Sequence, residues 1–156
     1  MKKNILYAFI TLCLVITSCS KDEPDHVHEH ELMTTMTITL TSSDGSGNVT
    51  LQTQDLDGDG PNAPDITVSG NLKSGVLYNG AIVLLNETES PAENVTMEIE
   101  EEDKEHQFFY TAGSGLDITT EYLNFDSDGN PLGTKFSLIA RSAGSGLLTF
   151  TLRHEP

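Results

Sequence analysis

Apolar and polar positions alternate along much of the chain from about Met33 onward. Met36, Ile38 and Leu40 alternate with threonines, which is the period-two pattern of a strand with one buried face. Similar alternation, or a short apolar run bounded by turn residues, predicts further strands near residues 49–53, 66–68, 75–85, 108–110, 117–125, 135–140 and 147–153. Short strands separated by turns favour an antiparallel sandwich or barrel, and we predict an all-β, Ig-like β-sandwich over residues 33–156.

One segment, residues 92–104, departs from this pattern. Ser90 and Glu93 fit a capping box with a proline at the first helical position, and Val95 and Ile99 would share one helix face. The apolar positions here also alternate as they would in a strand, but the acidic run that follows favours a helix on propensity. We therefore expect one short helix in an otherwise all-β domain.

The first residues have the features of an export signal. Lys2 and Lys3 precede an apolar run, residues 5–16, that has the length of a signal-peptide core and is too short to span a bilayer. The small residues before Cys19 resemble a bacterial lipobox, which implies cleavage before Cys19 and lipidation of its thiol and new amino group. We predict a lipoprotein signal peptide over residues 1–18 and a membrane anchor at Cys19. The alternative is an ordinary secreted protein with a stray cysteine.

A polar tether, residues 19–32, separates the anchor from the domain. Residues 20–23 read Ser-Lys-Asp-Glu and resemble the export tag of surface lipoproteins in the Bacteroidota. This resemblance implies an outer-membrane lipoprotein exposed on the cell surface. The alternative is an ordinary polar tether after the lipidated cysteine, with the protein on the periplasmic face.

The charge of the chain excludes one class of partner. The chain has 24 acidic and 8 basic side chains and a formal net charge of -16, whereas nucleic-acid binding needs a basic surface. We therefore expect no nucleic-acid partner. Of the 2 cysteines, Cys13 lies in the segment expected to be removed, so no disulfide framework is predicted.

The tether contains the most specific chemical motif of the chain. His26, His28 and His30 occupy alternate positions, and Glu31 follows directly. In an extended chain such residues lie roughly 6.5–7 Å apart on one side, a gap that side chains can close around one ion. Imidazoles with a carboxylate suit Zn²⁺, with Cu²⁺ and Ni²⁺ as competitors. The alternative is a solvated His-rich tether that binds metals weakly and incidentally.

The other histidines, His106 and His154, are further candidate metal ligands. On a helix, Glu102 and His106 would share a face and could chelate one ion together. His154 lies near the C-terminus beside Glu155. Either histidine would complete the set in the tether if the tether folds back, although each alone is also typical of a surface or strand-end histidine.

An acidic loop is a candidate calcium site. Asp55, Asp57, Asp59 and the glycine after them match the first half of an EF-hand loop. The second half does not match, because Ile66 occupies the position where a bidentate Glu is required. The segment therefore predicts either a calcium site of another kind or an acidic turn. Residues 126–131, Asp-Ser-Asp-Gly-Asn-Pro, are typical of a hairpin turn.

No catalytic motif is apparent in the sequence. There is no Gly-x-Ser-x-Gly nucleophile elbow, and no lysine follows the glycines of residues 113–115 as it would in a phosphate-binding loop. We therefore expect no enzymatic activity.

Several motifs together resemble a family of small Bacteroidota lipoproteins that carries the label "type 1 periplasmic binding fold superfamily protein". The motifs are the lipobox, His26-x-His28-x-His30-Glu31, Asp57-Gly58-Asp59-Gly60, Glu101-x-x-x-Glu105-His106-Gln107-Phe108-Phe109, Asp128-Gly129-Asn130-Pro131-x-Gly133 and Leu152-x-His154-x-Pro156. The resemblance implies a companion of a TonB-dependent outer-membrane receptor. A periplasmic binding fold needs two βα lobes, so the alternation in this chain predicts a β-sandwich rather than the fold in that label.

Two functions of different classes fit these features. The first is a metal-capturing lipoprotein that binds a divalent transition metal, with zinc as the leading choice, and works with a TonB-dependent receptor in uptake. The second is a non-enzymatic, Ig-like interaction module of the cell envelope with an incidental His tether.

Overall fold

The computed structural model of the chain describes residues 32–58 and 60–156. The chain divides into two units, Met1–His30 and Glu31–Pro156, and all the described residues belong to the second. Several predictions lie outside the described residues: the signal peptide, the anchor at Cys19, the export tag, the candidate ligands His26, His28, His30 and Glu31, and also Asp59.

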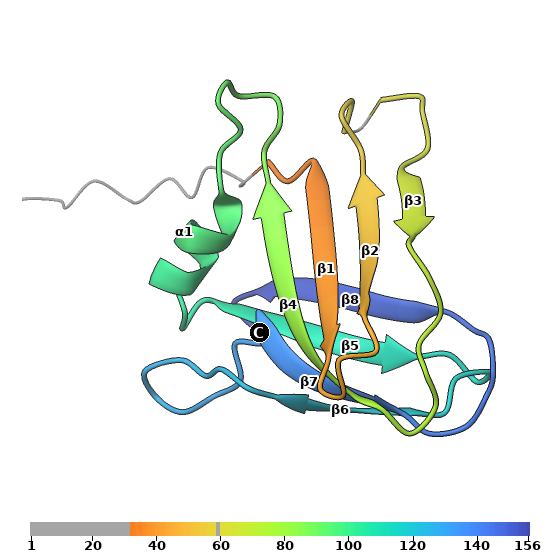
Figure 1. Ribbon diagram of the computed structural model, residues 1–156. Coiled ribbons are helices and arrows are strands. Elements are labelled where there is room, and N and C mark those ends of the chain that lie inside the picture. The colour runs from red at the N-terminus through yellow and green to blue at the C-terminus, as the bar shows by residue number, and fades with distance from the viewer. Residues whose placement is uncertain (1–31, 59) are drawn as a thin grey trace, which may run out of the picture. The chain divides into compact units, whose positions relative to one another are not determined.

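The described residues form antiparallel β-sheets with one short helix, which confirms the predicted all-β, sandwich-like fold (Figure 1). A strand is present at each predicted place. In chain order the elements are β1 (Thr35–Ser42), β2 (Asn48–Gln54), β3 (Asp65–Val68), β4 (Leu77–Leu85), α1 (Val95–Glu101), β5 (His106–Ala112), β6 (Ile118–Tyr122), β7 (Lys135–Ala140) and β8 (Leu148–His154).

One large sheet contains most of the strands. Its order is β3-β2-β1-β4-β7-β6, and every neighbouring pair is antiparallel. The predicted alternation is present in the middle of β1, where Ile38 and Leu40 are almost fully buried, Thr39 between them is half-buried and Thr41 is exposed. The other two strands, β5 and β8, pair in a separate two-stranded sheet.

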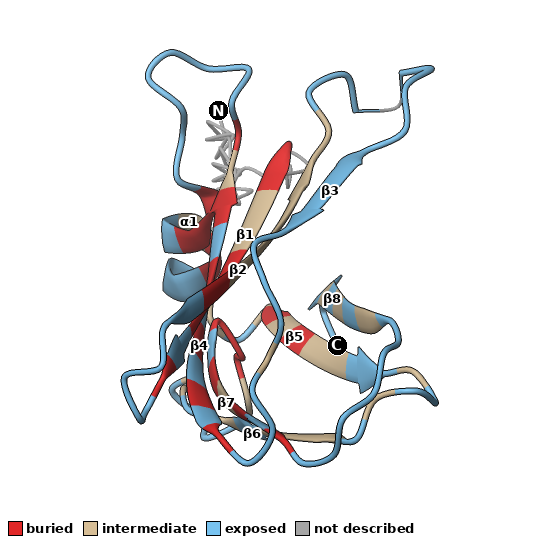
Figure 2. Cartoon of the chain, turned by 45° about the vertical axis from the view of Figure 1, so that its right-hand side comes forward, coloured by how far each residue is buried: buried red, intermediate tan, exposed pale blue. Residues whose placement is uncertain are grey.

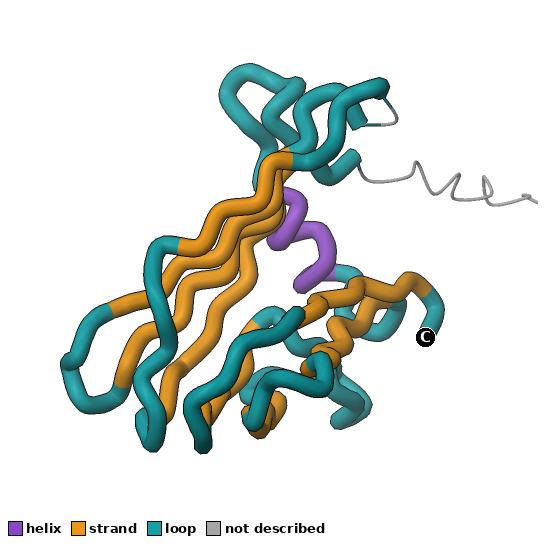
Figure 3. Tube along the Cα trace, turned by 90° about the vertical axis from the view of Figure 1, so that its right-hand side faces the viewer, coloured by secondary structure: helices purple, strands orange, loops and turns teal. Residues whose placement is uncertain are grey.

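The hydrophobic core lies on one face of the large sheet. Ile82 and Leu84 of β4 are buried there, and Val95 and Ile99 of α1 pack into the same cluster. Figure 2 shows the buried positions gathered on β1, β4, β7 and the facing side of α1. Figure 3 shows α1 and the two-stranded sheet on the same side of the large sheet, so both cover this core.

Aromatic rings join the two sheets. Tyr110 of β5 packs against Phe136 of β7 and Phe150 of β8, with ring centroids 4.6 and 5.7 Å away. The Tyr110 hydroxyl donates a hydrogen bond to the Gly133 carbonyl at 2.5 Å. Burial raises the pKa of Tyr110, because an ionised phenol would lose its hydration there. Phe108 is 1% exposed, as expected of a core anchor.

The helix is shorter than the predicted 92–104. It begins at Val95, and the side chain of the N-cap residue Asn94 accepts a hydrogen bond from a first-turn backbone N–H at 3.2 Å. The predicted capping box is wrong, because Glu93 instead forms a backbone bridge with Asn86, with N–H···O distances of 3.0 Å in both directions. In the part of the chain that the structure describes, no helix has the length and apolar character needed to cross a bilayer.

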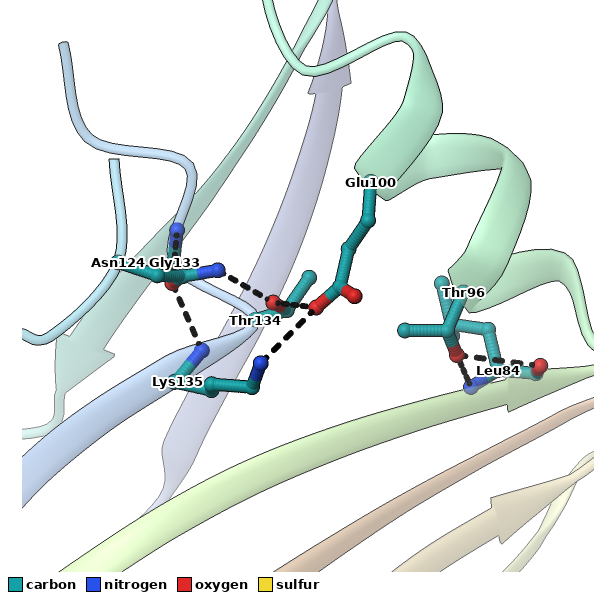
Figure 4. Close-up of polar contacts among 7 residues, drawn as sticks. All are labelled: Leu84, Thr96, Glu100, Asn124, Gly133, Thr134 and Lys135. Atoms are coloured by element: carbon teal, nitrogen blue, oxygen red, sulfur yellow. Dashed lines mark hydrogen bonds and ion pairs between the residues drawn. The ribbon is translucent and has the colours of Figure 1, made fainter. Parts of the chain in front are cut away.

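Polar contacts fasten both ends of α1 to the large sheet (Figure 4). In its first turn, Thr96 Oγ1 accepts a hydrogen bond from the Leu84 N–H at 2.7 Å. In its last turn, Glu100 Oε1 accepts a hydrogen bond from the Thr134 hydroxyl at 2.6 Å and pairs with Lys135 Nζ at 3.8 Å. The helix end is therefore held, and with it the turn that leads into β5.

Candidate functional site

The fold brings two histidines together that are far apart in the sequence. His106 is the first residue of β5 and His154 is the last of β8, and the two are direct antiparallel partners. Next to them, the Glu155 N–H donates to the Glu105 carbonyl at 2.7 Å, so the histidines occupy the adjacent non-hydrogen-bonded position. Side chains lie closest together at such positions. The two imidazole rings stack, with centroids 5.0 Å apart and planes at 30°.

The imidazole of His106 is held by the main chain. His106 is 4% exposed, and its Nδ1 lies 3.2 Å from the Glu102 carbonyl oxygen. Because a carbonyl oxygen only accepts hydrogen bonds, we assign the proton of the neutral ring to Nδ1 and the lone pair to Nε2. Metal-binding histidines commonly donate their second ring N–H in this way.

The contact between His106 and Glu102 differs from the predicted one. The sequence places both residues on one helix face, but α1 ends at Glu101 and a turn follows, in which the Glu105 N–H donates to the Glu102 carbonyl at 2.9 Å. His106 therefore begins a strand, and the contact is with the backbone carbonyl of Glu102.

A carboxylate lies beside the histidine pair. Glu105 Oε2 is 3.4 Å from His154 Nε2, and each of the two side chains is 44% exposed. A contact between groups this exposed is worth only about 0–1 kcal/mol to stability. A carboxylate oxygen therefore lies beside the imidazole of His154.

The histidine pair does not make a complete metal site with its described neighbours. Within residues 32–58 and 60–156, no three His, Cys, Asp or Glu side chains form a group that could hold an ion. A tightly bound Zn²⁺ usually has at least three protein ligands. His106 and His154 can supply two of them, so any further ligand has to come from beyond this pair.

The acidic loop between β2 and β3 is the second candidate site. Asp57 Oδ2 accepts a hydrogen bond from the Asn62 side chain at 2.6 Å, which holds the pKa of Asp57 below its ordinary value. Among the described residues, Asp55 Oδ1 is buried without a hydrogen-bond partner. A side chain at Gly60 would collide with the Asp57 carboxylate. Asn62 thus takes up part of the Asp57 carboxylate, as in an acidic turn.

Residues 126–131 form the predicted hairpin turn. The Asp126 Oδ1 accepts hydrogen bonds from the backbone N–H groups of Asp128 and Asn130, at 2.9 and 2.7 Å. The Asn130 side chain donates to the other oxygen at 2.9 Å, and this contact is the main cause that lowers the pKa of Asp126. The acidic side chain at the head of this segment therefore serves the turn itself.

Sequence reasoning found both histidines as candidates but not their pairing. The alternation around Phe108 and that around Leu152 each predict a strand, yet nothing in either segment says that the two strands are neighbours. Comparison of the chain with known protein families, with curated proteins and with solved structures finds no match.

Proposed function

We propose that this protein is an outer-membrane lipoprotein, anchored through Cys19, that binds a divalent transition metal, zinc first among them. The proposed ligands are His26, His28, His30 and Glu31 of the tether, and His106 and His154 of the domain are further candidate ligands. The lipoprotein works on the cell surface with a TonB-dependent receptor in metal uptake. The signal-peptide pattern supports the membrane location, and the family resemblance supports the TonB-dependent receptor as the partner.

One observation of the domain carries the metal-binding part of this proposal. His106 and His154 occupy a non-hydrogen-bonded pair on neighbouring strands, with stacked rings 5.0 Å apart, and the Glu102 carbonyl orients one of the rings. Two imidazoles presented by rigid strands lose little conformational freedom when they bind an ion. Zn²⁺ prefers three or four ligands, so the histidine pair supplies at most part of a complete site.

Calorimetric titration of the full-length protein in detergent with Zn²⁺ tests the ligand set. At pH 7.5 we expect the triple His26→Ala, His28→Ala, His30→Ala variant and the single His154→Gln variant each to bind at least about tenfold more weakly than the unchanged protein. His154 is the domain histidine to replace, because it is partly exposed whereas His106 is buried. Circular dichroism checks that each variant is folded.

The pH dependence separates the histidines from the acidic loop. Zn²⁺ competes with protons for imidazole nitrogen, so binding should weaken as the pH falls through roughly 6–7, where free imidazoles gain a proton. Binding by the carboxylates of Asp55, Asp57 and Asp59 would instead persist to about pH 4–5. Binding that survives at pH 5.5 and disappears in Asp57→Asn would move the ion, or a calcium ion in its place, to the acidic loop.

Equal Zn²⁺ affinity in the unchanged protein and both histidine variants at pH 7.5 would show that the replaced histidines are not Zn²⁺ ligands. The function would then be the second one, a non-enzymatic interaction module of the envelope. Purification of the lipoprotein from outer membranes tests the partner separately: a TonB-dependent receptor should copurify with it whether or not the histidines are replaced.

A further inference from the structure

The apolar face of the large sheet continues past the elements that cover it. Partners across the sheet share a face, and the row Ile82, Ile38, Leu51, Val68 runs from β4 to the edge strand β3. Ile82 and Ile38 are each 2% exposed, Leu51 is half-buried, and Val68 is 58% exposed. The elements that cover this face, α1 and the two-stranded sheet, therefore do not reach the edge strand β3.

A second row on the same face repeats this gradient. It runs from Leu84 through Met36 and Thr53 to Ile66 of β3. Leu84 is 3% exposed, whereas Ile66 is 77% exposed, the highest value among the large hydrophobic side chains of the described residues. Ile66 and Val68 thus continue the apolar face of the sheet to its edge, where no helix or strand of the described residues covers them.

The backbone of β3 is also unpaired on its outer side. The Ser69 N–H donates to the Thr50 carbonyl at 2.8 Å, so Ser69, Thr67 and Asp65 direct their N–H and C=O groups toward β2. The N–H and C=O groups of Ile66 and Val68 therefore point away from the sheet. Within the described ranges no hydrogen bond of these outward groups is present.

The two edges of the large sheet differ. Most residues of β6, the other edge strand, are half-buried, while all residues of β3 are exposed. Natural edge strands are often protected by proline and charge. Here Pro64 and Asp65 stand only at the start of β3, so they leave the outward groups of Ile66 and Val68 accessible.

From these features we infer that β3 is a docking edge for an extended segment of another protein that carries basic residues beside alternating apolar ones. The segment adds a strand to β3 and places its apolar side chains next to Ile66 and Val68. Charge favours a different protein over a second copy of this chain as the occupant. Two chains of net charge -16 repel each other. A lysine or arginine of the docked segment would instead be attracted by the exposed carboxylates of Asp65, in the strand, and Asp57, in the loop before it.

A synthetic peptide, Lys-Thr-Val-Thr-Val-Thr-Lys, serves as the probe, with a peptide bearing Glu in place of both Lys as its charge control. Fluorescence anisotropy is measured with the full-length protein in detergent. We expect the Lys peptide to bind at least about tenfold more tightly than the Glu peptide at low salt, and the difference to shrink at high salt. N-methylation of the amides along one edge of the peptide should abolish binding, while N-methylation along the opposite edge should not, because β3 pairs with one edge only.

Two matched protein variants complete the test. Ile66→Lys puts a charge on the apolar face and should weaken binding at least about tenfold, whereas Thr67→Lys adds the same charge on the opposite face and should leave binding within about twofold. Both positions are exposed, so both variants should fold. Three results would overturn the inference: no binding of the Lys peptide at millimolar concentration, equal binding by the two variants, or self-association of the unchanged protein that Ile66→Lys abolishes, which would make the occupant a second copy.

Discussion

At the scale of single residues, Gly133 shows how one missing side chain lets two sheets meet. Its φ of +86° lies in the left-handed region, and its carbonyl accepts the hydrogen bond from Tyr110. A Cβ atom here would lie 2.7 Å from the Tyr110 hydroxyl and 2.9 Å from a ring carbon of Tyr122. The glycine is therefore required twice, once by the backbone and once by the space between the aromatic rings.

Gly133→Ala should consequently destabilise the domain more than a glycine replacement elsewhere. Gly129 is the matched control, because its φ of +91° is similar but nothing lies within 4 Å of the added Cβ. We expect Gly129→Ala to cost about 1 kcal/mol for the backbone conformation alone. Gly133→Ala should cost about 1–3 kcal/mol more, for overpacking. Urea denaturation of the two variants measures the difference, and equal losses would show that the aromatic rings yield without cost.

At the scale of elements, the carboxylate of Glu87 ties strand ends together. Its Oε2 accepts hydrogen bonds from the Thr35 hydroxyl at the start of β1 and from the Gln54 amide at the end of β2, the latter at 2.6 Å. Its own N–H donates to the Thr34 hydroxyl at 2.9 Å. The hydrogen bond from Thr35, followed by that from Gln54, lowers the pKa of Glu87 from its ordinary value.

This lowered pKa predicts a stability that depends on pH. The folded chain binds the Glu87 proton more weakly than the unfolded chain, so the stabilisation is fully present above the ordinary pKa of 4.5 and is lost as the pH falls through the lowered folded value. The urea midpoint of the unchanged protein should therefore fall more between pH 6 and pH 3 than that of Glu87→Gln. Glu101→Gln, the same change on an exposed part of α1, controls for the loss of one negative charge. Parallel curves for Glu87→Gln and the unchanged protein would contradict the prediction.

The helix illustrates why element boundaries were harder to predict than element types. The Ser90 to Glu93 capping box is a local pattern, and local energies of this kind are small. Asn86 and Glu93 instead form a backbone bridge that closes the loop after β4, and Asn94 then takes the capping position. A tertiary pairing therefore outweighs the local capping signal.

At the scale of the whole molecule, the proposed location of the protein at the outer membrane rests on the sequence of its first residues. The proposed lipoprotein requires cleavage and lipidation at Cys19. Cys19→Ser should leave the precursor uncleaved or release the protein from the membrane fraction, because several acyl chains on one residue provide the anchor. Cys13→Ser, in the segment expected to be removed, is the matched control and should fractionate like the unchanged protein. Normal processing and membrane association of Cys19→Ser would rule out the lipoprotein proposal.

The alternation of apolar and polar residues by itself determined the all-β class, the place of each strand and much of the buried face. This follows from the period of two, which assigns each side chain to one face of its own strand without reference to any other strand. The hairpin turn headed by Asp126 was equally predictable, because its hydrogen bonds link residues that are close in sequence.

Only the tertiary structure decided which strands are neighbours. The pairing of β5 with β8 sets His106 against His154, and the end position of β3 leaves Ile66 and Val68 uncovered. A strand pattern specifies its buried face but not its partner, because every antiparallel edge offers the same backbone groups. The partner is chosen by how all the apolar faces and turns fit together, which is a property of the folded chain as a whole.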